Sequence, residues 1–222
     1  MPRARRATVP DDYAKNVFIN CPFDDAYREI FQALVFAVFE CGMRPRCALE
    51  AYDGGAIRID KIADIIRECR WGIHDISRTE LNENGLPRFN MPLELGLFLG
   101  ARRYGDRRQK EKSCLVMDRD QYRYQQFMSD IAGQDITAHG DVATRAIKAL
   151  RDWIGSSRPL PVLPGAEAIA DRLRRFTADL PAICEATERQ MSELTFVEFA
   201  DAASTWLQEE MERLGKASER RP

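Results

Sequence analysis

One acidic residue stands alone in an apolar segment of the chain. Glu94 is the only charged residue in the run MPLELGLFLGA, which extends from Met91 to Ala101. On a helix, its neighbours three and four positions on are Leu97 and Phe98, so its carboxylate shares an apolar face. A carboxylate in such surroundings is costly unless another group pairs with it or a reaction uses it. Glu94 is therefore the first candidate catalytic residue; the alternative is that it only caps its own helix, near the positive end of the helix dipole.

The residues around Glu94 favour the functional interpretation. Asn90 is a good N-cap and Pro92 fits the first helical turn, so the helix needs no further cap from Glu94. Gly96 and Gly100 lower the helix propensity and would normally be avoided. Their spacing of four predicts that the helix backbone approaches the sheet closely at these two positions.

Two aspartates lie at the carboxyl ends of apolar runs. Asp75 lies near the end of WGIHDIS, where α/β enzymes place polar site residues, and is the second candidate catalytic residue. It could instead cap the next helix or pair with Arg78. Asp118 ends the run SCLVMD and is a weaker candidate, because the residues after it also fit a turn and a helix start. His74 points to the strand face opposite Asp75 and is predicted to be a buried core histidine.

Short strand-like runs alternate with amphipathic helices along the chain. The predicted strands are residues 16–20, 45–51, 71–77, 113–118 and 134–138, and the predicted helices are residues 24–42, 57–69, 90–105, 121–131 and 141–154. This alternation predicts an α/β fold with a parallel sheet covered on both faces. With five strands and right-handed crossovers, we expect the flavodoxin-like strand order 2-1-3-4-5.

Ligands in such sheets bind beyond the carboxyl ends of the strands, near the switch between the first and third strands. That rule predicts these substrate-binding residues: Asn20, Cys21, Pro22, Phe23, Asp53, Arg58, Ser77, Asn90 and Asp118. Arg58 is a natural partner for a phosphate group. Neither G-x-G-x-x-G after the first strand nor G-x-x-x-x-G-K-[ST] is present, which disfavours a Rossmann-type dinucleotide site and a P-loop.

The composition narrows the classes of function. The 222 residues include 33 Lys plus Arg and 35 Asp plus Glu, whereas proteins that bind duplex DNA carry a basic surplus. Nucleic acid is not an expected partner, and the cations of residues 102–112 are expected to lie in a solvated loop. With six cysteines in no C-x-x-C pair and two histidines, we expect reduced thiols and no metal site. No apolar run is long enough to span a membrane, so a cytoplasmic location is expected.

The chain divides into four parts. We expect a polar tail (residues 1–15), an α/β domain (16–155), a Pro-rich linker (156–165) and a helical C-terminal extension (166–222). T-F-V-E at residues 195–198 is typical of a capping box for the last helix. That helix carries an apolar stripe formed by Phe199, Ala203, Trp206 and Leu207. Such a stripe is expected to pack on the domain or on a second copy of the chain, which makes a homo-oligomer through the C-terminal helices an expectation.

Three segments carry a resemblance to known families: VFINCPFDDAY, IRIDKIADIIRECRWGIHDIS and FNMPLELGLFLG. They resemble the bacterial TIR-like (Toll/interleukin-1 receptor-like) predicted nucleotide-binding families, and they are similar to the nucleoside 2-deoxyribosyltransferase superfamily. Both groups have a strand ending in a polar site residue, a loop, and a helix with E-L-G and a following glycine. The resemblance covers residues 16–154 and leaves the C-terminal helices unexplained.

The resemblance implies an enzyme that cleaves an N-glycosidic bond. In both groups the helix glutamate acts at the anomeric carbon of a ribosyl group, a role that falls on Glu94, and the strand aspartate of the transferases falls on Asp75. NAD or a related nucleotide would then be the substrate, with no further cofactor, and a toxic or antiviral defence role would follow. Two alternatives stay open: a non-catalytic nucleotide sensor that signals through the C-terminal helices, and a TIR-like module that only self-associates.

Overall fold

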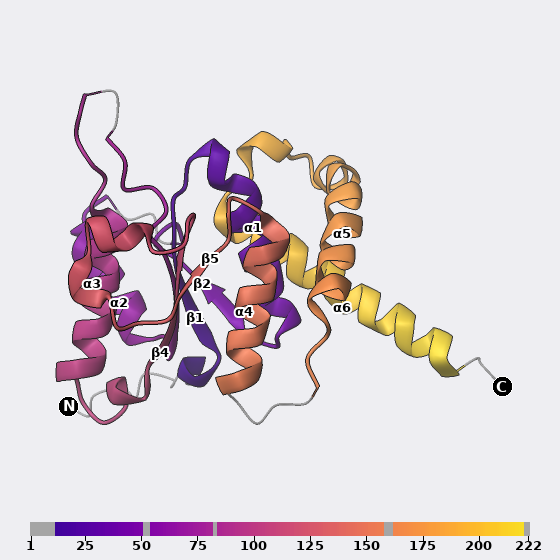
Figure 1. Ribbon diagram of the computed structural model, residues 1–222. Coiled ribbons are helices and arrows are strands. Elements are labelled where there is room, and N and C mark those ends of the chain that lie inside the picture. Colours follow the sequence, from indigo (N-terminus) through magenta and orange to yellow (C-terminus); the bar gives the residue numbers. More distant parts are fainter. Residues whose placement is uncertain (1–11, 51–53, 82–83, 158–161, 220–222) are drawn as a thin grey trace, which may run out of the picture.

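The computed structural model describes residues 12–50, 54–81, 84–157 and 162–219 (Figure 1). The strands are β1 (Asn16–Asn20), β2 (Arg44–Arg46), β3 (Trp71–Asp75), β4 (Ser113–Asp118) and β5 (Ile136–Ala138). The helices are α1 (Arg28–Glu40), α2 (Arg58–Arg67), α3 (Asn90–Tyr104), α4 (Ala143–Ser157), α5 (Ala166–Ala186) and α6 (Phe196–Glu219).

The five strands form one parallel sheet in the order β2-β1-β3-β4-β5, which confirms the predicted flavodoxin-like topology. Helices α1 and α4 cover one face of the sheet, and α2 and α3 cover the other (Figure 1). Because all strands are parallel, their carboxyl ends meet at one edge, which is at the top of Figure 1. The sheet thereby gathers the segments that follow β1, β3, β4 and β5.

Alternate side chains of β1 pack in two separate hydrophobic cores, because successive residues of a strand point to opposite faces of the sheet. Val17 and Ile19 pack on the α1–α4 side. Phe18 packs on the other side with the isoleucines of α2 and with Phe98 of α3. Every residue of β1 and β3 is buried, which is the expected burial of central strands in a sheet covered on both faces.

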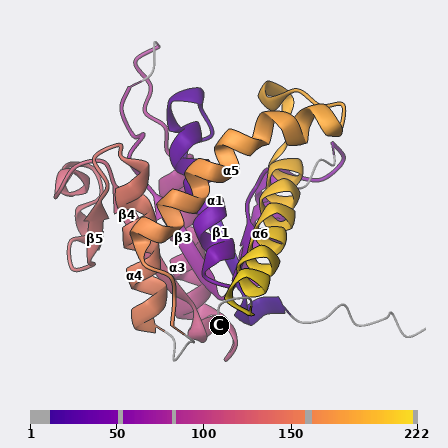
Figure 2. The ribbon, with the colours of Figure 1, turned by 90° about the vertical axis from the view of Figure 1, so that its right-hand side faces the viewer.

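The C-terminal helices form a third layer outside α1 and α4. Helix α5 packs on α1 and α4, and α6 packs on α1 and α5, as Figure 2 shows from the side. The Phe176 ring stacks on Phe36 of α1 at 5.5 Å and lies 5.7 Å from Trp206 of α6. Trp206 is 7% exposed, so the predicted burial of the apolar stripe is confirmed, and it occurs within one chain. No helix in the described ranges is long and apolar enough to cross a membrane.

The predicted capping box at the start of α6 is also present. The Glu198 backbone N–H donates to Thr195 Oγ1 at 3.3 Å, and Thr195 N–H donates to Glu198 Oε2 at 2.9 Å. At the other end of the chain, residues 12–14 form a 3-10 turn whose Tyr13 is buried and donates its hydroxyl to Arg108 O.

Two predicted elements differ from the observed ones. The strand predicted for residues 45–51 is limited to β2, because Cys47–Glu50 turns back and Arg46 pairs bidentately with Glu50. The helix predicted for residues 121–131 is replaced by two 3-10 turns, Arg123–Gln126 and Ser129–Ile131. Tyr122 has φ 62°, a left-handed conformation that an α-helix does not continue through.

Two expectations about α3 are wrong. Phe89, not Asn90, occupies the N-cap and makes no side-chain cap bond. A Cβ added at Gly96 or Gly100 would meet nothing within 4 Å, so neither glycine serves a close approach. The close approach is instead at Gly72 of β3, where a Cβ would come within 2.8 Å of Phe98.

Lys112 does not lie in a solvated loop as predicted, because it is only 2% exposed. Its ammonium donates to Ile66 O at 2.6 Å and to Cys69 O, and so satisfies carbonyl groups at the C-terminal end of α2. The Phe98 ring lies 4.6 Å from the same ammonium group. Burial lowers the pKa of Lys112 to about 8.

Candidate functional site

The end of β1 is fastened to the start of α3. The Asn20 side-chain amide donates to Met91 O at 2.8 Å and lies 3.1 Å from Nδ1 of His74. His74 is fully buried between the rings of Phe18 and Phe98, and burial lowers its pKa to about 3. The predicted core histidine is therefore confirmed. Through Asn20, the sheet holds the first turn of α3 at the β1–β3 switch point.

Glu94 lies in the second turn of α3, at this same edge. It is 7% exposed, and burial raises the pKa of its carboxyl group to about 7 against the opposing charge of Arg58. Within the described residues, no hydrogen bond or ion pair reaches the Glu94 carboxylate, and burial and the charge of Arg58 are what act on its pKa. A carboxylate that is buried and unpaired is costly to a fold, so helix capping does not account for its presence.

Two thiols lie near Glu94. The Cys21 thiol interacts electrostatically with the carboxylates of Asp75 and Glu94, and the Cys47 thiol interacts with that of Glu94. Burial and these charges raise the pKa of Cys21 well above its usual range and that of Cys47 to about 12. All six cysteines of the chain are free, as predicted. Since the thiolate is the reactive form, these two thiols are not suited to act as nucleophiles.

Asp75 ends β3 and is fully buried. Its Oδ1 accepts from the Ser77 backbone N–H at 2.9 Å and from the Ser77 hydroxyl, while its Oδ2 lies 2.9 Å from His139 Nε2. The Asp141 N–H donates to His139 Nδ1 at 3.0 Å, which places the imidazole proton on Nε2, facing Asp75. The Ser77 hydroxyl therefore donates to the Asp75 carboxylate, and His139 contacts Asp75 and not Ser77. In a Ser-His-Asp triad the histidine contacts the serine and activates it, so this arrangement is not such a triad.

Tyr27, in the 3-10 turn directly before α1, also belongs to this buried polar group. Tyr27 packs its ring against His139 at 6.1 Å, and burial together with the charge of Asp75 raises its pKa well above the usual range. Among the described residues, Tyr27 Oη, Asp75 Oδ2 and His139 Nε2 are buried without a hydrogen bond of good geometry. Buried polar atoms of this kind are rare in folded proteins, and functional sites are one place where they occur.

Asp118 is engaged in a different contact. Its Oδ1 accepts from Arg119 N–H at 2.7 Å and from Arg123 Nε at 2.9 Å. Arg123 also donates to Ile76 O at 2.8 Å, so it fastens the end of β4 to the segment after β3. Burial raises the pKa of Asp118 against the opposing effect of Arg123.

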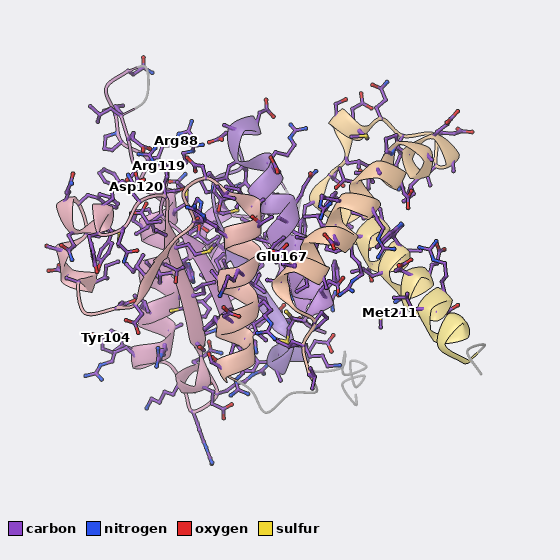
Figure 3. The ribbon with its side chains drawn as sticks, turned by 45° about the vertical axis from the view of Figure 1, so that its right-hand side comes forward. Arg88, Tyr104, Arg119, Asp120, Glu167 and Met211 are labelled. Carbon is purple, nitrogen blue, oxygen red and sulfur yellow. The ribbon has the colours of Figure 1, made fainter. Side chains whose placement is uncertain are left out.

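The rim of this edge is charged, and two of its arginines already have partners. Figure 3 shows Arg88, Arg119 and Asp120 at the end of the molecule where the strands finish, with Tyr104 at the opposite end of α3. Arg88 lies 3.1 Å from Asp24, and Arg119 lies 2.9 Å from Glu80. Arg58 is exposed at the start of α2 and close enough to act on the Glu94 charge.

The predicted site residues fall into two groups. The carboxyl edge brings together these: Asn20, Cys21, Pro22, Arg58, Asp75, Ser77, Glu94 and Asp118. Phe23 instead turns toward Phe31, with ring centroids 5.3 Å apart, and Asn90 is exposed at the start of α3. Asp53 lies outside the described residues.

Tyr27 and His139 were missed as site residues. His139 follows directly on β5, so the strand-end rule that selected Asp75 could have found it.

Comparison with protein-family models and with curated protein sequences found no match. Within the described ranges, no cluster of three or more His, Cys, Asp or Glu side chains is placed to hold a metal ion.

Proposed function

We propose that the protein cleaves the N-glycosidic bond of NAD or a related nucleotide, with Glu94 as the carboxylate beneath the ribosyl carbon. The observation that carries the proposal is Glu94 itself: buried, without a partner in the described part of the chain, and positioned at the β1–β3 switch point. The resemblance of its segment to two ribosyl-handling families supplies the reaction class.

The chemistry follows from charge. As the bond between the anomeric carbon and the base nitrogen breaks, its electron pair leaves with the base and the ribosyl carbon becomes cationic. A carboxylate in a desolvated site stabilises that cation strongly. The oxygen of a water molecule then bonds to the carbon, and the water gives up one proton to the solvent or to the departed base. The ionised form of Glu94 is the active one, so a pKa of about 7 predicts activity that rises with pH through neutrality.

Asp75 would serve this reaction by orienting the site. One of its oxygens is taken by Ser77 and the other faces His139, so its role is to hold the ends of β3 and β5 together beside Cys21. Arg58, exposed at the rim, is the residue we assign to a substrate phosphate. A toxic or defence role would follow from depletion of the substrate in a cell.

The test is product analysis by mass spectrometry. The wild-type protein is incubated with NAD, nucleosides and nucleotides, alongside Glu94→Gln and the control Glu167→Gln, which changes an exposed glutamate at the start of α5 (Figure 3). Release of nicotinamide or a free base by wild type and E167Q, but about a hundredfold more slowly by E94Q, would support the proposal.

Two other outcomes would replace the proposal. Saturable nucleotide binding without turnover would indicate the sensor instead. Neither binding nor turnover, together with concentration-dependent assembly, would indicate the self-association module.

A further inference from the structure

A cavity lies between the α/β domain and the C-terminal extension. It has a volume of about 170 Å³ and is bounded by the segment after β1, by α1, and by the turn that joins α5 to α6. Its aromatic wall consists of Phe23, Phe31, Phe196 and Phe199. The Phe31 ring lies 5.3 Å from Phe23 and 5.9 Å from Phe196, so rings from both parts of the chain form one continuous surface.

The rim of the cavity is polar. Asp24, Arg28 and Gln32 border it from the domain side, and Ser192 and Thr195 border it from the extension. The start of α6 also faces this region, and the capping box there occupies the backbone N–H groups of Thr195 and Glu198. The Glu198 carboxylate held at this helix end opposes a second anion, so the lining suits a neutral ring with hydrogen-bonding edges.

The Phe23 ring packs against Phe31 but is not covered by it. It is 39% exposed, although it belongs to a segment in which Cys21 and Pro22 are buried. An aromatic face that stays accessible beside further rings is the arrangement that proteins use to stack planar ligands.

We propose that this cavity is a binding pocket for one planar heteroaromatic ring, such as a nucleobase, and that the C-terminal extension exists in part to complete it. An apolar cavity of about 150 Å³ is large enough to hold benzene, so 170 Å³ accommodates one small ring system. The pocket is a ligand site of its own and does not depend on catalysis by Glu94.

The pocket is nevertheless placed to communicate with the Glu94 site. Phe23 is two residues from Cys21, a backbone distance of at most about 7 Å, and Cys21 feels the charges of Asp24, on the pocket rim, and of Glu94. Leu49, which also lines the pocket, is two residues from Cys47. A ring bound here would contact both segments and the start of α6 at once.

The experiment is ligand-observed and protein-observed NMR with adenine as the probe and inositol, a saturated polar ring, as its control. The full-length wild type is compared with Phe23→Ala, which removes the stacking face, and with Ser192→Trp, which fills the pocket from an exposed position. Phe127→Ala is the matched control, because Phe127 is 37% exposed and does not line the cavity.

The proposal expects millimolar adenine binding with shifts at the Thr195 and Phe196 amides, and no binding of inositol. Phe23→Ala should raise the adenine Kd about tenfold, Ser192→Trp should abolish binding, and Phe127→Ala should leave it unchanged. Absence of adenine binding to the wild type would overturn the proposal, as would binding that survives both pocket variants. Because binding is measured without turnover, loss of the proposed glycosidase function would not alter this outcome.

Discussion

Replacing Glu94 by Gln should stabilise the protein, and only at pH values at which the buried carboxyl group would otherwise be ionised. Burial raises the pKa of Glu94 from 4.5 to about 7, so the folded state binds more protons than the unfolded state between these pH values. The free energy of unfolding contributed by Glu94 therefore falls as pH rises from 4.5 to 7 and stays low above it. A glutamine at this position cannot ionise, so the variant does not lose this free energy of unfolding as the pH rises.

The magnitude follows from linkage. A difference of about 2.5 pKa units corresponds to roughly 3 kcal/mol between the fully protonated and fully ionised limits. Between pH 5 and pH 8 the wild type should lose about 2.5 kcal/mol relative to the variant. The cost of burying the Gln amide is the same at both pH values and cancels from this comparison.

Urea unfolding of wild type, E94Q and E167Q at pH 5 and pH 8 measures the effect. The exposed Glu167 should give a free-energy difference from wild type that is nearly the same at both pH values. If E94Q behaves like E167Q, Glu94 is solvated in solution and its assignment as a desolvated catalytic carboxylate loses its physical basis. A pH-dependent gain with loss of turnover would instead mark a residue kept for function at a cost in stability.

Three further variants test the packing around the site. His139→Phe keeps a ring beside Tyr27 but leaves Asp75 Oδ2 buried without its neighbour, and thermal or urea unfolding should show a loss of about 1–3 kcal/mol; an unchanged midpoint would mean that the contact is not formed. Lys112→Met should cost more at pH 10 than at pH 7, because the folded-state pKa of about 8 lies below the unfolded value of 10.5 and the lysine's own contribution rises with pH between them; a cost that is constant with pH in urea titrations would contradict this. Trp206→Ala should lower the free energy of unfolding by about 3–5 kcal/mol, and a negligible change would show that α6 does not pack on α1 and α5 in solution.

Much of the fold could be predicted from the sequence because its causes are local. The alternation of apolar strands with amphipathic helices determined the α/β class, and the handedness of parallel crossovers reduced the strand orders to the observed one. The capping box at Thr195 and the stripe around Trp206 depend on spacings of three and four residues, so they too were visible. Glu94 was found for the same reason: a single charge breaks an apolar helical pattern.

What the sequence could not supply depends on which distant residues meet. His139 reaches Asp75 only because β4 brings β5 beside β3 with the observed register, and no local pattern records that pairing. Lys112 was predicted to be solvated because it belongs to a run of charged residues. In the structure its ammonium group is buried against the carbonyl groups at the end of α2. Phe23 was assigned to the site around Glu94, but its ring packs against Phe31 of α1, which in turn lies beside Phe196 of the extension. Periodicity specifies the face of an element on which a side chain lies, whereas tertiary packing decides which neighbour that face contacts, because contacts between distant segments form only when the elements assemble.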